Sequence, residues 1–174
     1  YSHIRESVII GKNVSVGRGV YIGPGVQIGD NCKNQNYSLI YEPASIEAGV
    51  FIGPSVVLTN DKNPRAINID ESVKFETDWE KSAVVIKKGA SIGAKSVCVA
   101  PVEIGEWAMI AAGTVLTKNV PAFGLMAGNP AKRIGWVGKP GFRLKSLGQD
   151  DYYCEKTQER YLQIDADTLI EIIN

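Results

Sequence analysis

Aliphatic residues recur at every sixth position along two long stretches of the chain. Fourteen of the sixteen positions are Ile, Leu or Val, although these three types make up only about a quarter of all residues. The positions are Ile4, Ile10, Val16, Ile22, Ile28, Asn34, Ile40, Ile46, Ile52, Leu58, Ile86, Ile92, Cys98, Ile104, Ile110 and Leu116. A period of six fits neither a helix, whose period is 3.6, nor a long strand, whose period is 2. It predicts short strands that turn a corner once per hexad and point the aliphatic residue inward each time.

This pattern resembles that of the hexapeptide-repeat transferases over roughly residues 4 to 122. The resemblance implies an all-β fold: a left-handed parallel β-helix in which three hexads make one 18-residue coil, with one long inserted loop and a small C-terminal extension. The left hand comes from the resemblance alone, because the usual crossover rule predicts the opposite. Coils stacked about 4.8 Å apart place residues eighteen positions apart in one column. We therefore expect Cys32 and Cys98 in the interior wall, and Asn34 as an internal amide bonded to neighbouring backbone.

The six-residue rhythm stops after Leu58 and resumes at Ile86. An insertion of about 22 residues restores the phase, so the segment NDKNPRAINIDESVKFETDWEK, at about 60–81, is expected to leave the coil at a corner. It is either a solvated surface loop or a functional loop, and long loops in compact domains are more often functional. Once the insertion is subtracted, three residues of successive coils line one corner beside the loop: Asn60, Ala100 and Lys118.

We divide the chain into three parts. The first is the β-helix, residues 1–122, with its inserted loop; the second is a coenzyme-binding exit segment and connector, residues 123–149. The third is a small β extension, residues 150–174, with two short strands predicted around Arg160 to Ile164 and Thr168 to Ile173. Because this extension contains only one cysteine, Cys154, it cannot bind zinc by itself, and we expect a packing or interface role.

Charge and composition exclude several classes of function. Nineteen basic and nineteen acidic residues cancel, so no global field attracts nucleic acid or an anionic membrane. No apolar run reaches transmembrane length, and the N-terminal YSHIRESVII lacks a signal-peptide pattern, so we expect a soluble cytoplasmic protein without a membrane span. Between Trp107 and Gln149, however, there are six Lys or Arg and no acidic residue, which allows local anion binding.

The chain has one histidine, His3, so a three-histidine zinc site within one chain is excluded, and we expect no metal. A zinc site shared between chains would need His3 at each interface. A hydroxyl acceptor needs a positioned base, whereas an amine with a pKa of roughly 7.7 to 8.0 already has a neutral fraction at neutral pH. Because no histidine is available near the loop, the sequence favours acylation of an amine.

The start of the inserted loop indicates the acceptor. It matches the TN-x-x-x-PRA segment of the branch that acetylates amino sugars carried on nucleotides, at Thr59, Asn60, Pro64, Arg65 and Ala66. The resemblance implies an acetyl-CoA-dependent N-acetyltransferase in which the amine of a nucleotide-linked amino sugar, such as a 3-amino sugar, attacks the thioester directly. It further implies that Asn60 orients the amine or the thioester carbonyl, and that Arg65 holds the loop or the anionic part of the substrate.

Two neighbours of Asn60 are further candidates. Asp61 is either the proton acceptor or a residue that caps the loop through its own backbone. Asn63 is a candidate for substrate binding, together with Arg65.

The donor has a separate signature. The segment AGNPAKRI, residues 127–134, resembles the exit motif after the last coil of coenzyme A dependent hexapeptide transferases. In that role Lys132 and Arg133 face the phosphates of the coenzyme. Ala94 and Ala112 share a column and leave room for the pantetheine arm, unless they merely suit tight corners. Lys118 is also counted among the cofactor-binding candidates.

One β-helical prism has flat faces, whereas ligand sites need concave walls. We therefore expect a homotrimer, as in related transferases, with three equivalent sites between subunits. Two alternatives remain open: a sugar O-acetyltransferase, which the missing histidine weakens, and a non-catalytic β-helix that binds or scaffolds.

Overall fold

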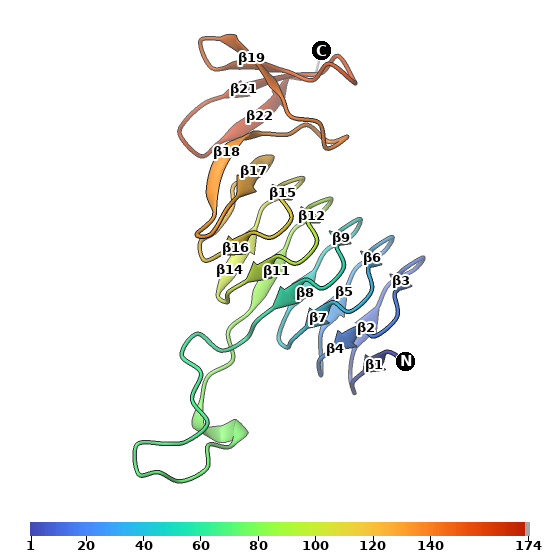
Figure 1. The fold of residues 1–174 in the computed structure, drawn as a ribbon. Helices are drawn as coiled ribbons and strands as arrows, with labels where there is room; N and C mark the ends of the chain where they lie inside the picture. Colours follow the sequence, from blue (N-terminus) through green and yellow to red (C-terminus); the bar gives the residue numbers. More distant parts are fainter. Residues whose placement is uncertain (173–174) are drawn as a thin grey trace.

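The computed structural model describes residues 1–172, which form short β-strands, turns and one inserted loop. Three parallel sheets wrap the chain into a left-handed β-helix, and each coil contributes one strand to each sheet (Figure 1). A small antiparallel sheet stands beyond the last coil, at the opposite end from the N-terminus. The fold class expected from the six-residue period is therefore confirmed.

We call the three parallel sheets A, B and C. Sheet A contains β1 (His3–Ile4), β4 (Tyr21–Ile22), β7 (Leu39–Ile40), β10 (Val57–Leu58), β13 (Val97–Cys98) and β16 (Val115–Leu116). Sheet B contains β2 (Ile9–Ile10), β5 (Gln27–Ile28), β8 (Ser45–Ile46), β11 (Val84–Ile86) and β14 (Val102–Ile104). Sheet C contains β3 (Ser15–Val16), β6 (Lys33–Asn34), β9 (Phe51–Ile52), β12 (Ser91–Ile92), β15 (Met109–Ile110) and β17 (Gly124–Ala127), and β18 (Lys132–Trp136) is added antiparallel at its edge.

Strand registers give the length of one coil. Ile4 pairs with Ile22, and Ile22 pairs with Ile40, a step of eighteen residues each time. The backbone N–H of Arg5 donates to the carbonyl of Ile22 at 2.9 Å, and the same bond recurs from coil to coil. The second residue of each two-residue strand points inward and is buried from the second coil on, so the aliphatic column is the core. Cys32 and Cys98 are fully buried in this wall, as expected, and burial raises the pKa of Cys98 to about 12.

The inserted loop, residues 59–83, leaves the coil between β10 and β11 and projects sideways from the body (Figure 1). Leu58 pairs with Cys98 in the next coil, a step of forty residues, which is one coil plus the 22-residue insertion. The loop is closed at its base because Ser82 N–H donates to the carbonyl of Asn60 at 2.8 Å. The prediction that the coil is interrupted and then resumes in phase is confirmed.

The outer part of the loop is ordered by its own polar groups. A bridge joins Ile67 to Val73, and a short 3₁₀ helix, η1 (Glu76–Asp78), follows. The Asp78 carboxylate accepts hydrogen bonds from Phe75 N–H at 2.8 Å and from the Asn68 amide at 3.2 Å. These two bonds lower the pKa of Asp78 below its ordinary value.

After the last coil, β17 pairs in parallel with β15 and antiparallel with β18, and this reversal ends the solenoid. The chain then forms an antiparallel sheet of β19 (Lys145–Gly148), β20 (Asp151–Tyr153), β21 (Arg160–Gln163) and β22 (Leu169–Ile172). The last two strands lie where the sequence predicts strands; Ile173, the end of that prediction, is outside the described residues. The first two strands were not predicted.

A second apolar cluster joins this sheet to the coil. Its buried members are Phe123, Trp136, Leu144, Cys154, Tyr161 and Leu169. Cys154 is completely buried there, which is a packing role.

The expectation for Asn34 is wrong. Its side chain is buried in the column between Val16 and Ile52, but neither amide atom has a hydrogen-bond partner among the described residues. The neighbouring backbone groups are already used between coils: Gly17 N–H donates to the Asn34 carbonyl, and Gln35 N–H donates to the Ile52 carbonyl. The amide therefore occupies an aliphatic position without the bonds that would offset its burial.

We expect Asn34→Leu to raise the free energy of unfolding by about 1–3 kcal/mol, because it removes an unpaired buried amide and keeps the side-chain shape. Urea unfolding followed by circular dichroism measures the change. Lys33→Ala, at the exposed neighbouring position of the same strand, is the control and should change stability by less than about 0.5 kcal/mol. A lower midpoint for Asn34→Leu would mean that the amide is paired in solution.

Candidate functional site

The turns from sheet A to sheet B stack into one edge of the prism, which we call the Asn60 corner. Successive coils place six residues along it: Glu6, Pro24, Glu42, Asn60, Ala100 and Lys118. Ala100 is buried, and its N–H donates to Thr59 Oγ1 at 3.0 Å across the base of the loop. The stacking of Asn60 with Ala100 and Lys118 is as the sequence predicts.

Asn60 lines a hollow of about 390 Å³ between this corner and the returning end of the loop, which we call the Asn60 pocket. Its walls include Tyr21, Tyr41, Glu42, Trp79 and Lys81. Lys81 Nζ lies 3.1 Å from Glu42 Oε1, with the two side chains 31% and 15% exposed, and 5.9 Å from the centre of the Trp79 ring. This ion pair joins the end of the loop to the coil below Asn60.

The other acceptor-side candidates lie farther out on the loop. Asp61 and Asn63 line a neighbouring hollow with Lys74 and Asp78. Asp61 Oδ1 accepts the Asn63 N–H at 2.8 Å, which is the bond of a residue that caps its own turn. Arg65 is exposed, lines neither hollow, and donates to the Pro64 carbonyl at 2.9 Å.

The donor-side candidates gather on a different edge, between sheets C and A, which we call the Ala112 corner. Gly113 N–H donates to the Ala94 carbonyl at 2.8 Å, so Ala94 and Ala112 lie in adjacent coils. A Cβ on Gly93 would meet the Ala112 nitrogen at 2.4 Å, so only glycine permits this close approach. Above them, Ala131 N–H donates to the Val115 carbonyl at 2.9 Å, and β18 begins at Lys132.

Arg133, the neighbouring cation, is engaged within the chain. Its NH1 donates to Asp167 Oδ1 at 2.9 Å, in the turn between β21 and β22, and its guanidinium lies 4.2 Å from the centre of the Trp136 ring. Lys118 is exposed on the Asn60 corner and does not join the donor-side group. The structure thus brings together Ala94, Ala112 and the start of β18.

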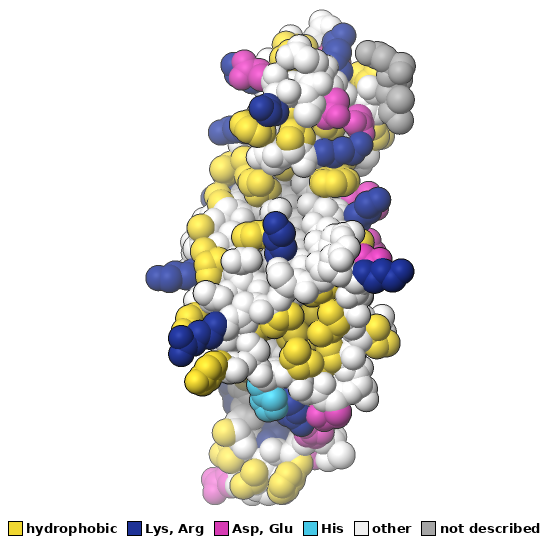
Figure 2. All heavy atoms as spheres, turned by 90° about the vertical axis from the view of Figure 1, so that its right-hand side faces the viewer, with side chains coloured by type: hydrophobic (Ala, Val, Ile, Leu, Met, Phe, Trp, Pro, Cys, Tyr) yellow, Lys and Arg dark blue, Asp and Glu magenta, His cyan; other side chains and the backbone are white. Residues whose placement is uncertain are grey.

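Sheet A separates the two corners. Six residues run from Ala94 to Ala100, which corresponds to about 20 Å of extended chain. The outer face of sheet A carries a ladder of half-buried apolar side chains: Tyr21, Leu39, Val57, Val97 and Val115. Figure 2 shows hydrophobic side chains gathered beside the single histidine, His3, whose ring lies 5.5 Å from that of Tyr21 at the start of the ladder.

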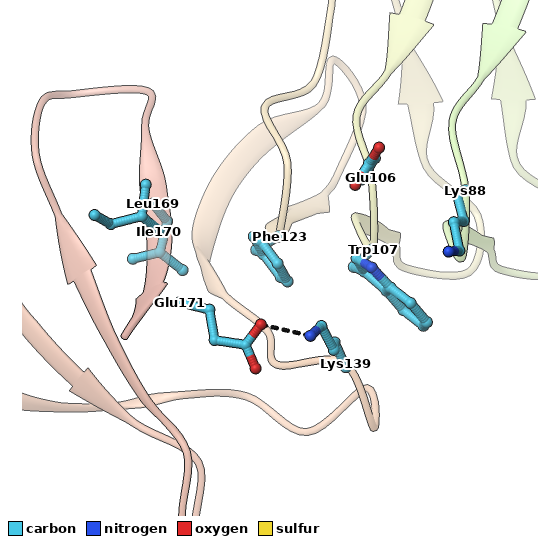
Figure 3. Close-up of a pocket in the computed structure, with 8 residues that line it drawn as sticks. All are labelled: Lys88, Glu106, Trp107, Phe123, Lys139, Leu169, Ile170 and Glu171. Atoms are coloured by element: carbon cyan, nitrogen blue, oxygen red, sulfur yellow. Dashed lines mark hydrogen bonds and ion pairs between the residues drawn. The ribbon is translucent and has the colours of Figure 1, made fainter. Parts of the chain in front are cut away.

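A larger hollow, of about 510 Å³, lies between the last coil and the C-terminal sheet. Trp107 and Phe123 face Leu169 and Ile170 of β22 across it (Figure 3). Lys139 and Glu171 pair at its edge at 2.5 Å, and this hydrogen bond raises the pKa of Lys139. None of the candidate residues lines this hollow, so its size alone does not make it the site of the chemistry.

No group of three or more His, Cys, Asp or Glu within residues 1–172 is arranged to hold a metal ion. In the same range, no helix has the length and apolar character needed to cross a membrane.

Several residues of the Asn60 pocket were missed by the sequence reasoning. Glu42 stands eighteen positions before Asn60, so counting coils downward as well as upward would have found it. Trp79 and Lys81 carry no such signal, because they lie in the loop, where the period is absent.

Two stretches of the chain match models of known repeat families. A model of the bacterial transferase hexapeptide, with six repeats, matches residues 1–33, and a model of the hexapeptide repeat of succinyl-transferase matches residues 83–118. The dTDP-3-amino-3,6-dideoxy-alpha-D-galactopyranose 3-N-acetyltransferase of Aneurinibacillus thermoaerophilus is 49% identical over 63 residues, which are 36% of this chain and 33% of that protein. Serine acetyltransferase 4 of Arabidopsis thaliana is 33% identical over 100 residues, 58% of this chain and 22% of that protein.

The chain thus aligns with a third or less of the length of these curated relatives. Among solved structures, a variant of GDP-perosamine N-acetyl transferase from Caulobacter crescentus, in complex with CoA and GDP-perosamine, has a TM-score of 0.63 and 23% identity. The match covers 77% of this chain and 53% of that one, and it shows a common fold. The six-residue period, the three-sheet coil and both model matches identify residues 1–33 and 83–118 as hexapeptide repeats of a left-handed β-helix.

Proposed function

We propose that this chain is an acetyl-CoA-dependent N-acetyltransferase that acts on the amine of a nucleotide-linked amino sugar. The observation that carries the proposal is Asn60: it stands in a pocket at the base of the inserted loop, and no histidine lines that pocket. The relative from Aneurinibacillus thermoaerophilus, named as a 3-N-acetyltransferase of a dTDP-linked amino sugar, supports the choice of acceptor.

The chemistry suits a site without an imidazole base. The neutral amine attacks the thioester carbonyl carbon, the C–N bond forms, and the C–S bond breaks. The nitrogen loses a proton to water, and the leaving thiolate gains one. In this reaction the Asn60 amide donates to the carbonyl oxygen, where negative charge develops, while its backbone is fixed by Ser82 N–H.

The remaining candidates take supporting roles. Asp61 shapes the loop through its bond to Asn63. Arg65 is exposed, donates one hydrogen bond to the Pro64 carbonyl, and meets the anionic part of the acceptor with its remaining N–H groups. On the donor side, the small residues at Ala94 and Ala112 accept the pantetheine arm. Lys132 and Arg133 meet the phosphates of the coenzyme, and Arg133 exchanges its bond with Asp167 for them.

The active assembly in this proposal is a homotrimer. The apolar ladder on sheet A supports it, because an unpartnered apolar sheet face is a place for another subunit to pack. Three prisms with sheet A toward a common axis would bring the Asn60 corner of one chain beside the Ala112 corner of the next. Closed cyclic symmetry then makes three identical sites, each with an acceptor side and a donor side from different chains.

Release of coenzyme A thiol tests the activity directly. A panel of nucleotide-linked amino sugars and their hydroxyl analogues, each with acetyl-CoA, should give turnover with an amino sugar only. Turnover of a hydroxyl sugar would instead identify an O-acetyltransferase. If calorimetry detects no binding of acetyl-CoA at all, the chain is a non-catalytic scaffold.

Asn60→Ala should lower kcat by about 10²–10³, the usual effect of removing a donor that stabilises a developing oxyanion. The circular dichroism spectrum should not change, because Asn60 lies on a corner and not in the core. Asn60→Asp is the matched variant: it keeps the shape, loses the N–H donors, and should be similarly impaired. Full activity in both would remove Asn60 from the mechanism.

Light scattering should give a mass about three times the 18.8 kDa of one chain. Chains carrying Asn60→Ala, mixed with chains carrying both Lys132→Ala and Arg133→Ala, should regain activity, because some sites then combine two intact sides. Homotrimers of either variant alone are the controls and should stay inactive. A fully active monomer contradicts the model, and inactive mixed trimers would place both sides of the site on one chain.

A further inference from the structure

Acyl transfer uses only one end of the Asn60 pocket. From Asn60 the pocket runs down the corner past Glu42 and Pro24 to Glu6, which are one, two and three coils below. At about 4.8 Å per coil, this is roughly 14 Å of groove beyond the reacting amine. Its residues have no role in the chemistry proposed above.

The lower part of the groove is aromatic. The Tyr21 and Tyr41 rings are half-buried, with centres 5.2 Å apart and planes inclined by 46°. Trp79, also half-buried, reaches the same pocket from the returning end of the loop. Three aromatic side chains from three separate segments therefore converge on one hollow, which is a surface suited to stacking a planar ring.

In the lower part of the groove, the charged side chains suit an uncharged ring better than a phosphate group. Arg5 is paired with Glu6 at 2.9 Å, so its charge is balanced there. Glu76, from η1, also lines the groove and offers carboxylate oxygens that accept N–H groups. A planar, uncharged ring that carries N–H donors meets both requirements, and a nucleobase is such a ring.

Lys81 marks the middle of the groove. It lies at the level of Glu42, one coil below Asn60 and one coil above Tyr21 and Pro24. In this arrangement Lys81 exchanges its bond with Glu42 for the linking phosphates of an extended nucleotide sugar, which pass between the amine at Asn60 and a ring at Tyr21. The order along the corner is then sugar, phosphates and base.

We infer that Tyr21, Tyr41 and Trp79 form the nucleobase-binding part of the acceptor site, and that they determine which nucleotide the chain accepts. The inference rests on the proposed function for the identity of the acceptor. Its test does not, because it measures binding of a nucleotide without sugar and without acetyl-CoA.

Calorimetry with dTDP and GDP, and with inorganic pyrophosphate as a probe without a base, tests the inference. At least one of the two nucleotides should bind wild-type protein more tightly than pyrophosphate does. Tyr21→Leu and Trp79→Leu should each weaken that binding by about 5- to 150-fold, the range for loss of one stacked aromatic partner, and leave pyrophosphate unaffected. Phe142→Leu, at an exposed aromatic residue beside the C-terminal sheet, is the control and should bind as wild type.

Circular dichroism checks that each variant is folded. Trp79 lies on the inserted loop and not in a coil, so Trp79→Leu still tests the inference if Tyr21→Leu does not fold. When the substrate is a nucleotide sugar that the wild-type protein acetylates, both variants should have a higher KM and a nearly unchanged kcat. This is the result expected when a contact made equally in the ground state and the transition state is lost. The inference is overturned if neither nucleotide binds, or if binding is unchanged in both variants. Thiol release that persists in either case would leave the proposed acetyl transfer standing.

Discussion

The backbone hydrogen bonds between coils are the constraint on which the rest of this structure depends. Each strand contributes few residues, yet the N–H groups of one coil donate to the carbonyls of the next along all three sheets. In the regular coils this ladder repeats the inward positions every eighteen residues and aligns the corners. The exceptions are the coil with the inserted loop and the last coil, in which Ile104 pairs with Val120 and Met109 with Leu125. The Asn60 corner and the Ala112 corner are straight lines of residues for this reason, and chemistry can be built along each of them.

Much of the fold follows from the sequence because this constraint is periodic. The aliphatic column from Ile22 to Leu116 could be read directly, and the phase across the loop gave the pairing of Leu58 with Cys98. Asn34 shows the limit of that reasoning. A period says that a side chain points inward, but not whether its amide finds a free backbone group, and here the groups were already used between coils.

The site was predictable only where the period reaches it. Asn60 could be placed with Ala100 and Lys118 by counting, whereas Trp79 and Lys81 belong to a loop whose path depends on its own hydrogen bonds. Arg133 is predicted to face the phosphates of the coenzyme, and the sequence gives no sign of its contact with Asp167. Its bond to Asp167 joins residues far apart in the chain, through a hairpin that packs by an apolar cluster and not by the repeat. Contacts of this kind do not follow the repeat, so they can be identified only from the three-dimensional structure.

The position at which the loop leaves the coil affects how the length of the loop can change in evolution. Leu58 and Cys98 pair in the ordinary register of adjacent coils, although the loop lies between them in the sequence. The pairing of the coils therefore does not depend on the number of residues in the loop. Changes in loop length at this place leave the pairing of the later coils unchanged. The Asn60 side of the molecule is therefore able to diversify by changes in loop length, while the stacked coils that carry the Ala112 corner keep their pairing.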